Sequence, residues 1–211
     1  LDTALPPNEK IPSIFGGIQN VSGHNGSGAI IFMLRWFLQR YLIQSNAIQL
    51  YTKFMISRND HYYECIHNVS SYQVGSGQLW IPPGADYGGL TDRHLIVGGN
   101  YEVYDALDIY PTYFTTPWIQ QRGCMNTEQL VQQVWREHKF VIKKFPRVMY
   151  LISTSNTTNK YMQQDMIPHP NVTTNGLYIK YPQEEYDSTI LRQNCNKQTT
   201  KGGKKDDSDL V

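Results

Sequence analysis

Side chains able to bind a cation or a phosphate follow directly after the mostly apolar run 51–57. They are Arg58, Asp60 and His61, with Asn59 between the first two. Carboxylate oxygens are hard ligands that suit Mg²⁺ or Mn²⁺, and the oxygens of a bound diphosphate fill the other positions of such an ion. This makes Asp60 a candidate metal ligand and Arg58 a candidate phosphate contact. The alternative is a surface ion pair or a turn.

A second polar segment follows a stretch rich in proline and glycine. Gly88 and Gly89 allow the backbone to approach a ligand closely. Asp92, Arg93 and His94 then place a hydrogen-bond acceptor, a bidentate donor and a titratable ring just ahead of an apolar run. We expect a ligand site here. The alternative is that Asp92 and Arg93 only hold the loop by hydrogen bonds, with His94 satisfied in the core.

Glu128 belongs to a third segment, Asn126-Thr127-Glu128, at the start of a predicted helix. Its carboxylate is a candidate acceptor for a ligand hydroxyl. The alternative role is structural, because an acid in the first turn of a helix completes a capping box or interacts with the helix dipole.

The elements between these segments are predicted to place them at strand ends. Apolar residues recur at helical spacing over 29–44, which predicts an amphipathic helix packed on a sheet. The runs 51–57, 78–81 and 95–97 predict strands. A polar cluster at the carboxyl end of a buried strand is the usual position of a site in an α/β sheet.

The second half of the chain continues the alternation. Asn100 is predicted to cap a helix that runs to about Tyr110 and is ended by Pro111 and Pro117. Asn126 or Thr127 is predicted to cap another helix. Strand character is found in three further runs, 140–145, 147–153 and 177–181. Helices alternating with strands predict an α/β fold with a mixed sheet.

Composition favours one domain. With 211 residues, 40% of them hydrophobic, the chain supports one sizeable core, and we expect it over 1–195. The polar stretch 196–211 is interpreted as a tail or linker that can lead to further domains. The net charge of +1 offers no basic stripe to nucleic acid. No run approaches the roughly 20 apolar residues that span a bilayer, and no signal peptide is found, so we expect a cytoplasmic protein without a membrane span.

Cysteines and asparagines give a weaker indication of compartment. Cys65, Cys124 and Cys195 are odd in number and form no Cys-x-x-Cys pair, which favours free thiols in a reducing compartment. Asn-x-Ser/Thr triplets accept glycans in secreted proteins. Without a signal peptide we expect them to be incidental here; they begin at Asn20, Asn25, Asn68, Asn156 and Asn171.

In this order the three segments resemble those of glycosyltransferases with the nucleotide-diphospho-sugar fold, the GT-A fold. In that family a strand ends in Arg-x-Asp, a Gly-Gly loop precedes an Asn/Thr-Asp-Arg-Phe/His motif, and a Glu opens a later helix. The corresponding residues here are Arg58–Asp60, Gly88-Gly89, Thr91–His94 and Asn126–Glu128. The overall sequence also resembles the enzymes by which large DNA viruses of algae build capsid glycans in the host cytoplasm.

The resemblance implies a GT-A-like mixed sheet flanked by helices and the transfer of a hexose or deoxyhexose from a UDP-sugar to a glycan acceptor. Glucose and rhamnose are both suitable sugars. It also implies Mn²⁺ or Mg²⁺ held by Asp60 against the donor diphosphate, with Arg58, Gly88 and Gly89 binding the donor. The implied catalytic residues are Asp92, Arg93, His94 and Glu128.

Two features depart from the family pattern. The segment Arg58-Asn59-Asp60 has one carboxylate where the family has Asp-x-Asp, and only residues 1–50 precede the strand that leads to it. A non-catalytic carbohydrate-binding module is the main alternative, although such modules are expected to be all-β and the predicted helix at 29–44 argues against one. A scaffold that has lost turnover is a second alternative.

Overall fold

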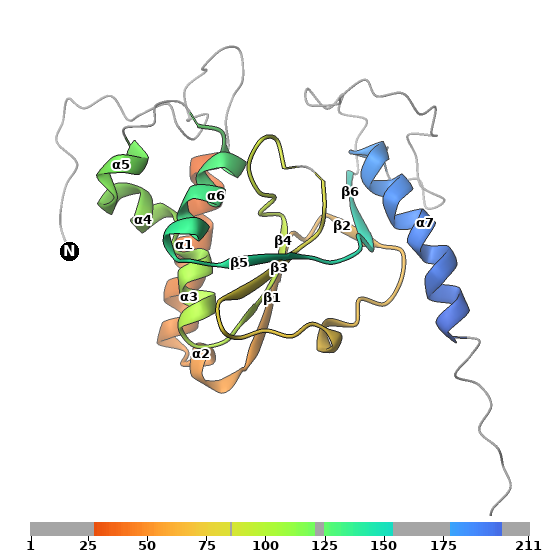
Figure 1. Cartoon of the computed structure of the whole chain (residues 1–211), viewed down its shortest axis with the longest axis horizontal. Helices are drawn as coiled ribbons and strands as arrows, with labels where there is room; N and C mark the ends of the chain where they lie inside the picture. Colours follow the sequence, from red (N-terminus) through yellow and green to blue (C-terminus); the bar gives the residue numbers. More distant parts are fainter. Residues whose placement is uncertain (1–27, 85, 121–124, 154–177, 200–211) are drawn as a thin grey trace, which may run out of the picture.

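The computed structural model describes residues 28–84, 86–120, 125–153 and 178–199 (Figure 1). Four of the five Asn-x-Ser/Thr triplets and the tail after Thr199 lie outside these ranges.

The central element is a four-stranded sheet. Its strands lie in the order β1 (Lys53–Ser57), β4 (His94–Gly98), β3 (Gln78–Ile81) and β5 (Val141–Lys144). β4 is antiparallel to both of its neighbours, whereas β3 and β5 are parallel, so the sheet is mixed. Every residue of β4 is buried, as expected for an inner strand.

Six helices gather on one side of this sheet in Figure 1 and enclose the main core. They are α1 (Gly28–Gln44), α2 (Ala47–Leu50), α3 (Tyr101–Leu107), α4 (Ile109–Thr115), α5 (Pro117–Gln120) and α6 (Thr127–Glu137). Trp135 of α6 is fully buried, and its ring nitrogen donates a hydrogen bond of 3.0 Å to the carbonyl of Ala106. The core therefore joins α6 to α3 as well as to the sheet.

A smaller sheet lies on the other side, beside α7 (Pro182–Thr199) (Figure 1). Its strands are β2 (His61–Tyr63), β6 (Met149–Ser153) and β7 (Tyr178–Ile179), all antiparallel. Ser188 of α7 donates a hydrogen bond of 3.1 Å to the carbonyl of Met149, which fixes the helix against β6.

The predicted α/β class is confirmed: the sheet is mixed and flanked by helices. The strand predicted over 78–81 has those bounds, and the strand predicted over 95–97 is longer by one residue at each end. The other predicted strands in the described ranges are found with shorter bounds. β2, α2, α5 and α7 were not predicted. Because α7 continues to Thr199, residues 196–199 are helical instead of part of a polar tail.

The prediction that α1 packs on the sheet through its apolar side holds only in part, because Leu38 and Leu42 pack against the core that contains Leu79 and Val97 of the sheet. α1 contacts α3 and α4, and Phe32 and Gln39 are its buried residues. Most of the predicted apolar side is an exposed stripe, made of Ile30, Met33, Leu34, Phe37 and Tyr41. α1 carries apolar residues on most of its circumference, so spacing alone did not reveal the buried face. No helix within the described ranges combines the length and apolar character needed to cross a membrane.

Two predicted helix signals after β4 are corrected. Asn100 precedes α3 with a φ of 55°, and its side chain makes no capping hydrogen bond. Pro111 does not end a helix: the break falls at Asp108, and Pro111 lies in the first turn of α4, where its missing N–H costs no intrahelical bond. Pro117 does follow the end of α4 and opens α5.

Cys65 is also corrected, because it forms a disulfide instead of remaining a free thiol. The cysteine to which it is bonded is not among the residues whose side chains the structure describes. Sequence spacing gave no sign of this bond, because a disulfide depends on the approach of two cysteines in space.

Candidate functional site

The first two polar segments meet because β1 and β4 run antiparallel. Ser57, the last residue of β1, pairs with His94, the first residue of β4. The chain leaving β1 at Arg58 therefore begins beside the chain that enters β4 from Arg93. Two segments far apart in sequence thus share one end of the four-stranded sheet.

The third segment joins them through the two glycines. The backbone N–H of Leu90 donates to the carbonyl of Glu128 at 3.0 Å. A Cβ at Gly89 would lie 2.1 Å from that carbonyl oxygen, so only glycine fits there. Gly88 has a φ of +82°, which also favours glycine. The glycines were predicted to let the backbone approach a ligand, but here they let it approach the start of α6. This contact places Glu128 beside the Asp92 segment.

Asp60 lies between two cationic side chains. Arg58 donates from Nε to Oδ1 and from Nη2 to Oδ2, both at 2.8 Å, and Nζ of Lys180 donates to Oδ2 at 2.7 Å. Burial acts to raise the pKa of Asp60, but these hydrogen bonds outweigh it and hold the pKa well below its usual range. Asp60 is therefore ionised and fully engaged, with Lys180 supplied by the chain directly after β7.

The arrangement does not by itself fit a resident divalent ion. Both oxygens of Asp60 accept hydrogen bonds from cations, and a metal would have to displace at least one of them. Within the part of the chain that the structure describes, no group of three or more His, Cys, Asp or Glu is arranged to hold a metal ion.

Asp92 and Glu128 are neighbouring carboxyl groups with different surroundings. Asp92 pairs with Arg35 of α1 at 3.1 Å, and each side chain is 11% exposed. Glu128 has its pKa raised by burial, and the nearby charge of Asp92 adds to this effect. Thr127 donates a hydrogen bond of 2.7 Å to Glu128. A carboxyl group with a raised pKa beside a fixed charge is a common feature of acid–base sites.

The capping box of α6 does not use Glu128. Asn126 accepts from the backbone N–H of Gln129, whose side chain accepts in turn from the N–H of Asn126. The predicted cap at Asn126 is confirmed, and the structural alternative of Glu128 as its partner is wrong. The other structural alternative, an acid that interacts with the helix dipole, agrees with the position of Glu128 in the first turn of α6.

Arg93 is anchored to α7. It pairs with Glu184 at 3.2 Å, donates to the hydroxyl of Tyr181 at 3.1 Å and stacks on that ring at 4.4 Å. Glu184 also pairs with the buried Arg147 at 3.2 Å. Arg93 thus borders the site while holding α7 against it.

His94 lies behind the site surface, with 0% of its area exposed. Its Nδ1 is 3.0 Å from the hydroxyl of Ser57, which is also 2.9 Å from Nδ1 of His61. Burial lowers the pKa of His94 to about 3 and that of His61 to about 4, so both rings are neutral near pH 7. This placement suits a positioning role for His94 instead of contact with a substrate.

Sequence reasoning missed four residues of the site: Arg35, Lys180, Tyr181 and Glu184. Three of them lie around the start of α7. Pro182 followed by Glu184 and Glu185 is a helix-start signal that would have revealed this helix. Nothing local indicated that it packs beside Arg93.

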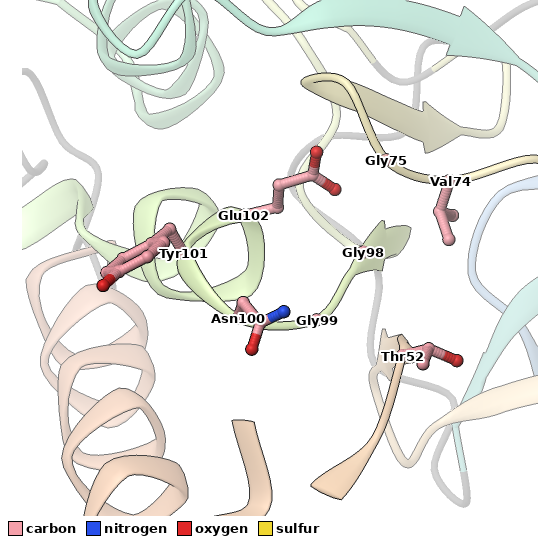
Figure 2. Close-up of a pocket in the computed structure, with 8 residues that line it drawn as sticks. All are labelled: Thr52, Val74, Gly75, Gly98, Gly99, Asn100, Tyr101 and Glu102. Carbon is pink, nitrogen blue, oxygen red and sulfur yellow. The ribbon is translucent and has the colours of Figure 1, made fainter. Parts of the chain in front are cut away.

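A pocket of about 340 Å³ lies at the other end of β1 and β4, lined by Thr52, Gly98, Asn100 and Glu102 among others (Figure 2). It contains none of the predicted site residues. Its one carboxylate, Glu102, accepts a hydrogen bond of 2.7 Å from the backbone of Gly77. We place the candidate site at the Asp60 end, because that end combines several cations with carboxylates.

Comparisons with protein family models, curated proteins and solved structures find no match for this chain.

Proposed function

We propose that this chain is a glycosyltransferase domain that transfers a hexose or deoxyhexose from a UDP-sugar to a glycan acceptor. The observation that carries the proposal is the meeting of Arg58, Asp60, Asp92 and Glu128 at one end of the β1–β4 pair. These residues come from three segments that resemble one family's motifs in order. The alternatives, a carbohydrate-binding module or a scaffold, need no such cluster of acidic and basic side chains.

The donor diphosphate is assigned to Arg58 and Lys180. A guanidinium has five N–H donors, and Asp60 accepts from two of those on Arg58, so the same group can also contact phosphate oxygens. Asp60 orients both cations. Mn²⁺ or Mg²⁺ would have to reach Asp60 in competition with Lys180, so the dependence of binding on the metal is the second variable to measure.

The acceptor hydroxyl is assigned to Glu128. The hydroxyl oxygen forms a bond to the anomeric carbon as the bond from that carbon to the diphosphate oxygen breaks. UDP leaves with the electron pair, and the hydroxyl proton passes to the Glu128 carboxylate. The charge of Asp92, which pairs with Arg35, raises the pKa of its neighbour Glu128 and so favours proton uptake there.

The setting suggested by the resemblance is capsid glycan synthesis by a virus in the host cytoplasm. The disulfide at Cys65 favours an oxidising compartment instead. The transfer chemistry is compatible with either.

Calorimetric titration with UDP-glucose and UDP-rhamnose, each with and without Mn²⁺, tests the proposal. We expect binding by the wild type and a loss of about 10-fold or more in Arg58→Gln, equivalent to one charge-assisted hydrogen bond. Lys143→Gln, an exposed change on β5, is the matched control and should bind as the wild type does. No binding of either donor under any condition would leave the scaffold or carbohydrate-binding alternative.

A further inference from the structure

Asn68 begins the one Asn-x-Ser/Thr triplet that falls within the described ranges, Asn68-Val69-Ser70. The triplet enters the short 3₁₀ helix η2 (Val69–Ser71), and the Asn68 side chain makes no capping hydrogen bond to it. The side chains of Asn68 and Ser70 are both exposed. The proposed transferase site does not include this triplet.

The backbone around Asn68 is held by hydrogen bonds that its carbonyl groups accept from side chains. Lys53 donates from Nζ to the carbonyls of Val69 at 3.0 Å and Tyr72 at 2.6 Å. The Ser71 hydroxyl donates to the carbonyl of Asn68 at 2.7 Å. None of these bonds uses the Asn68 amide group, so a substituent on that group leaves the turn intact.

The exposed side of this segment also carries an isolated apolar side chain. Ile66 is 89% exposed, the highest value among the large hydrophobic residues described. His67, between Ile66 and Asn68, is partly buried, with its ring 4.9 Å from that of Phe145. Ile66 and Asn68 thus flank an inward side chain and share the outer side of the segment.

The disulfide at Cys65 supplies an independent indication. Disulfides form and persist in oxidising compartments such as the lumen of the endoplasmic reticulum. That is also where asparagine in this triplet receives glycans. The disulfide and the exposed triplet lie within one short segment and agree on the compartment.

We infer that Asn68 is an N-glycosylation site and that the attached glycan covers Ile66. The Nδ2 nitrogen of Asn68 forms a bond to the anomeric carbon of the first sugar of a polyprenyl-diphosphate-linked oligosaccharide. The bond from that carbon to the diphosphate oxygen breaks, polyprenyl diphosphate leaves with the electron pair, and one amide proton is released. This inference is independent of the proposed transferase activity.

The test uses the full chain directed into the endoplasmic reticulum of a eukaryotic cell, with Asn68 left as the only acceptor. The other four triplets are removed by Asn→Gln changes at Asn20, Asn25, Asn156 and Asn171. We expect a mass increase that peptide N-glycosidase removes and that peptide mapping places on Asn68. Because the glycan is added to the nascent chain, the readout does not require a stable fold.

Matched variants identify the cause of the mass shift. Asn68→Gln and Ser70→Ala should lose it, whereas Ser71→Ala, which lies outside the triplet, should keep it. An unmodified Asn68 in the single-acceptor chain, or a shift that survives Ser70→Ala, overturns the site. For the covering role, removal of the glycan should increase self-association by sedimentation in the wild type and not in Ile66→Ser. An equal increase in both overturns that part.

Discussion

Asp60 has two cationic partners, Arg58 two residues before it in sequence and Lys180 from a distant part of the chain. This arrangement keeps the carboxylate ionised and orients Arg58 and Lys180 together. The sequence alone suggested a metal ligand at this position. The geometry shows the ion pair that was the alternative at this position, extended by Lys180.

Asp60→Asn tests this pairing through the pH dependence of stability. A carboxyl group with a lowered pKa in the folded state contributes stability that is fully present above its unfolded pKa of about 4 and is lost as the pH falls through the folded pKa. We expect the variant to be less stable by about 1 kcal/mol in urea unfolding at pH 6. The difference should shrink at pH 3, while Glu137→Gln, exposed on α6, should change little. A difference that is the same at both pH values would contradict the pairing.

Glu128→Gln tests the assignment of the base. A raised pKa keeps the proton on Glu128 to a higher pH, so the wild-type rate should rise as the pH passes through a value above the ordinary pKa of glutamate. We expect the variant to lose about 100-fold or more in kcat and to lose this acidic limb of the pH profile. Since burial disfavours the charged form, the variant should be at least as stable as the wild type at pH 7. An unchanged pH profile would exclude Glu128 as the base.

At the scale of elements, the site depends on two backbone contacts. The antiparallel pairing of β1 with β4 joins the first two polar segments, and the loop at Gly89 fixes the start of α6 beside them. The capping box at Asn126 leaves Glu128 facing this junction. A small displacement of α6 would therefore separate Glu128 from Asp92.

Gly89→Ala should displace α6. Its Cβ would lie 2.1 Å from the backbone of Glu128, so we expect a loss of about 2 kcal/mol or more in the free energy of unfolding. Gly75→Ala is the control, because its Cβ meets nothing within 4 Å and only its φ of +105° opposes alanine. That change should cost about 1 kcal/mol. If urea unfolding shows the same loss of stability in both variants, the contact between Gly89 and Glu128 does not explain the effect of Gly89→Ala.

At the scale of the whole molecule, α7 packs against the site and brings the last described part of the chain to it. Glu184 lies between Arg93 and Arg147, and 5% of its area is exposed. These two ion pairs connect α7 to the residue before β4 and to the segment before β6. The site is thus completed only when the last described helix is docked.

Glu184→Gln should release this helix. Breaking a buried ion pair leaves uncompensated charge and typically costs about 3 kcal/mol. We expect faster hydrogen exchange over residues 182–199, whereas the exposed change Gln183→Ala should stay within about 0.5 kcal/mol of the wild type. Unchanged exchange in Glu184→Gln would show that α7 is held by other contacts.

Local patterns predicted much of the sheet and the three polar segments. The apolar runs before Arg58 and after Arg93 indicated β1 and β4, and the cap at Asn126 was readable because its signal lies within a few residues. The pairing of Arg58 with Asp60 is also local.

Contacts between distant parts of the chain could not be predicted in this way. Lys180 lies 120 residues from Asp60, and the disulfide at Cys65 depends on which cysteines meet in space. The burial of His94 and the exposure of Phe37 on α1 were set by packing partners that no periodicity identifies.

The most direct test of the account is the release of UDP from UDP-glucose or UDP-rhamnose on addition of a glycan acceptor, measured for the wild type, Arg58→Gln and Glu128→Gln. We predict acceptor-dependent release by the wild type and its loss in both variants. Release that is equal in all three proteins, or a wild type that binds the donor and releases no UDP with any acceptor, would contradict the assignment of transfer to this site.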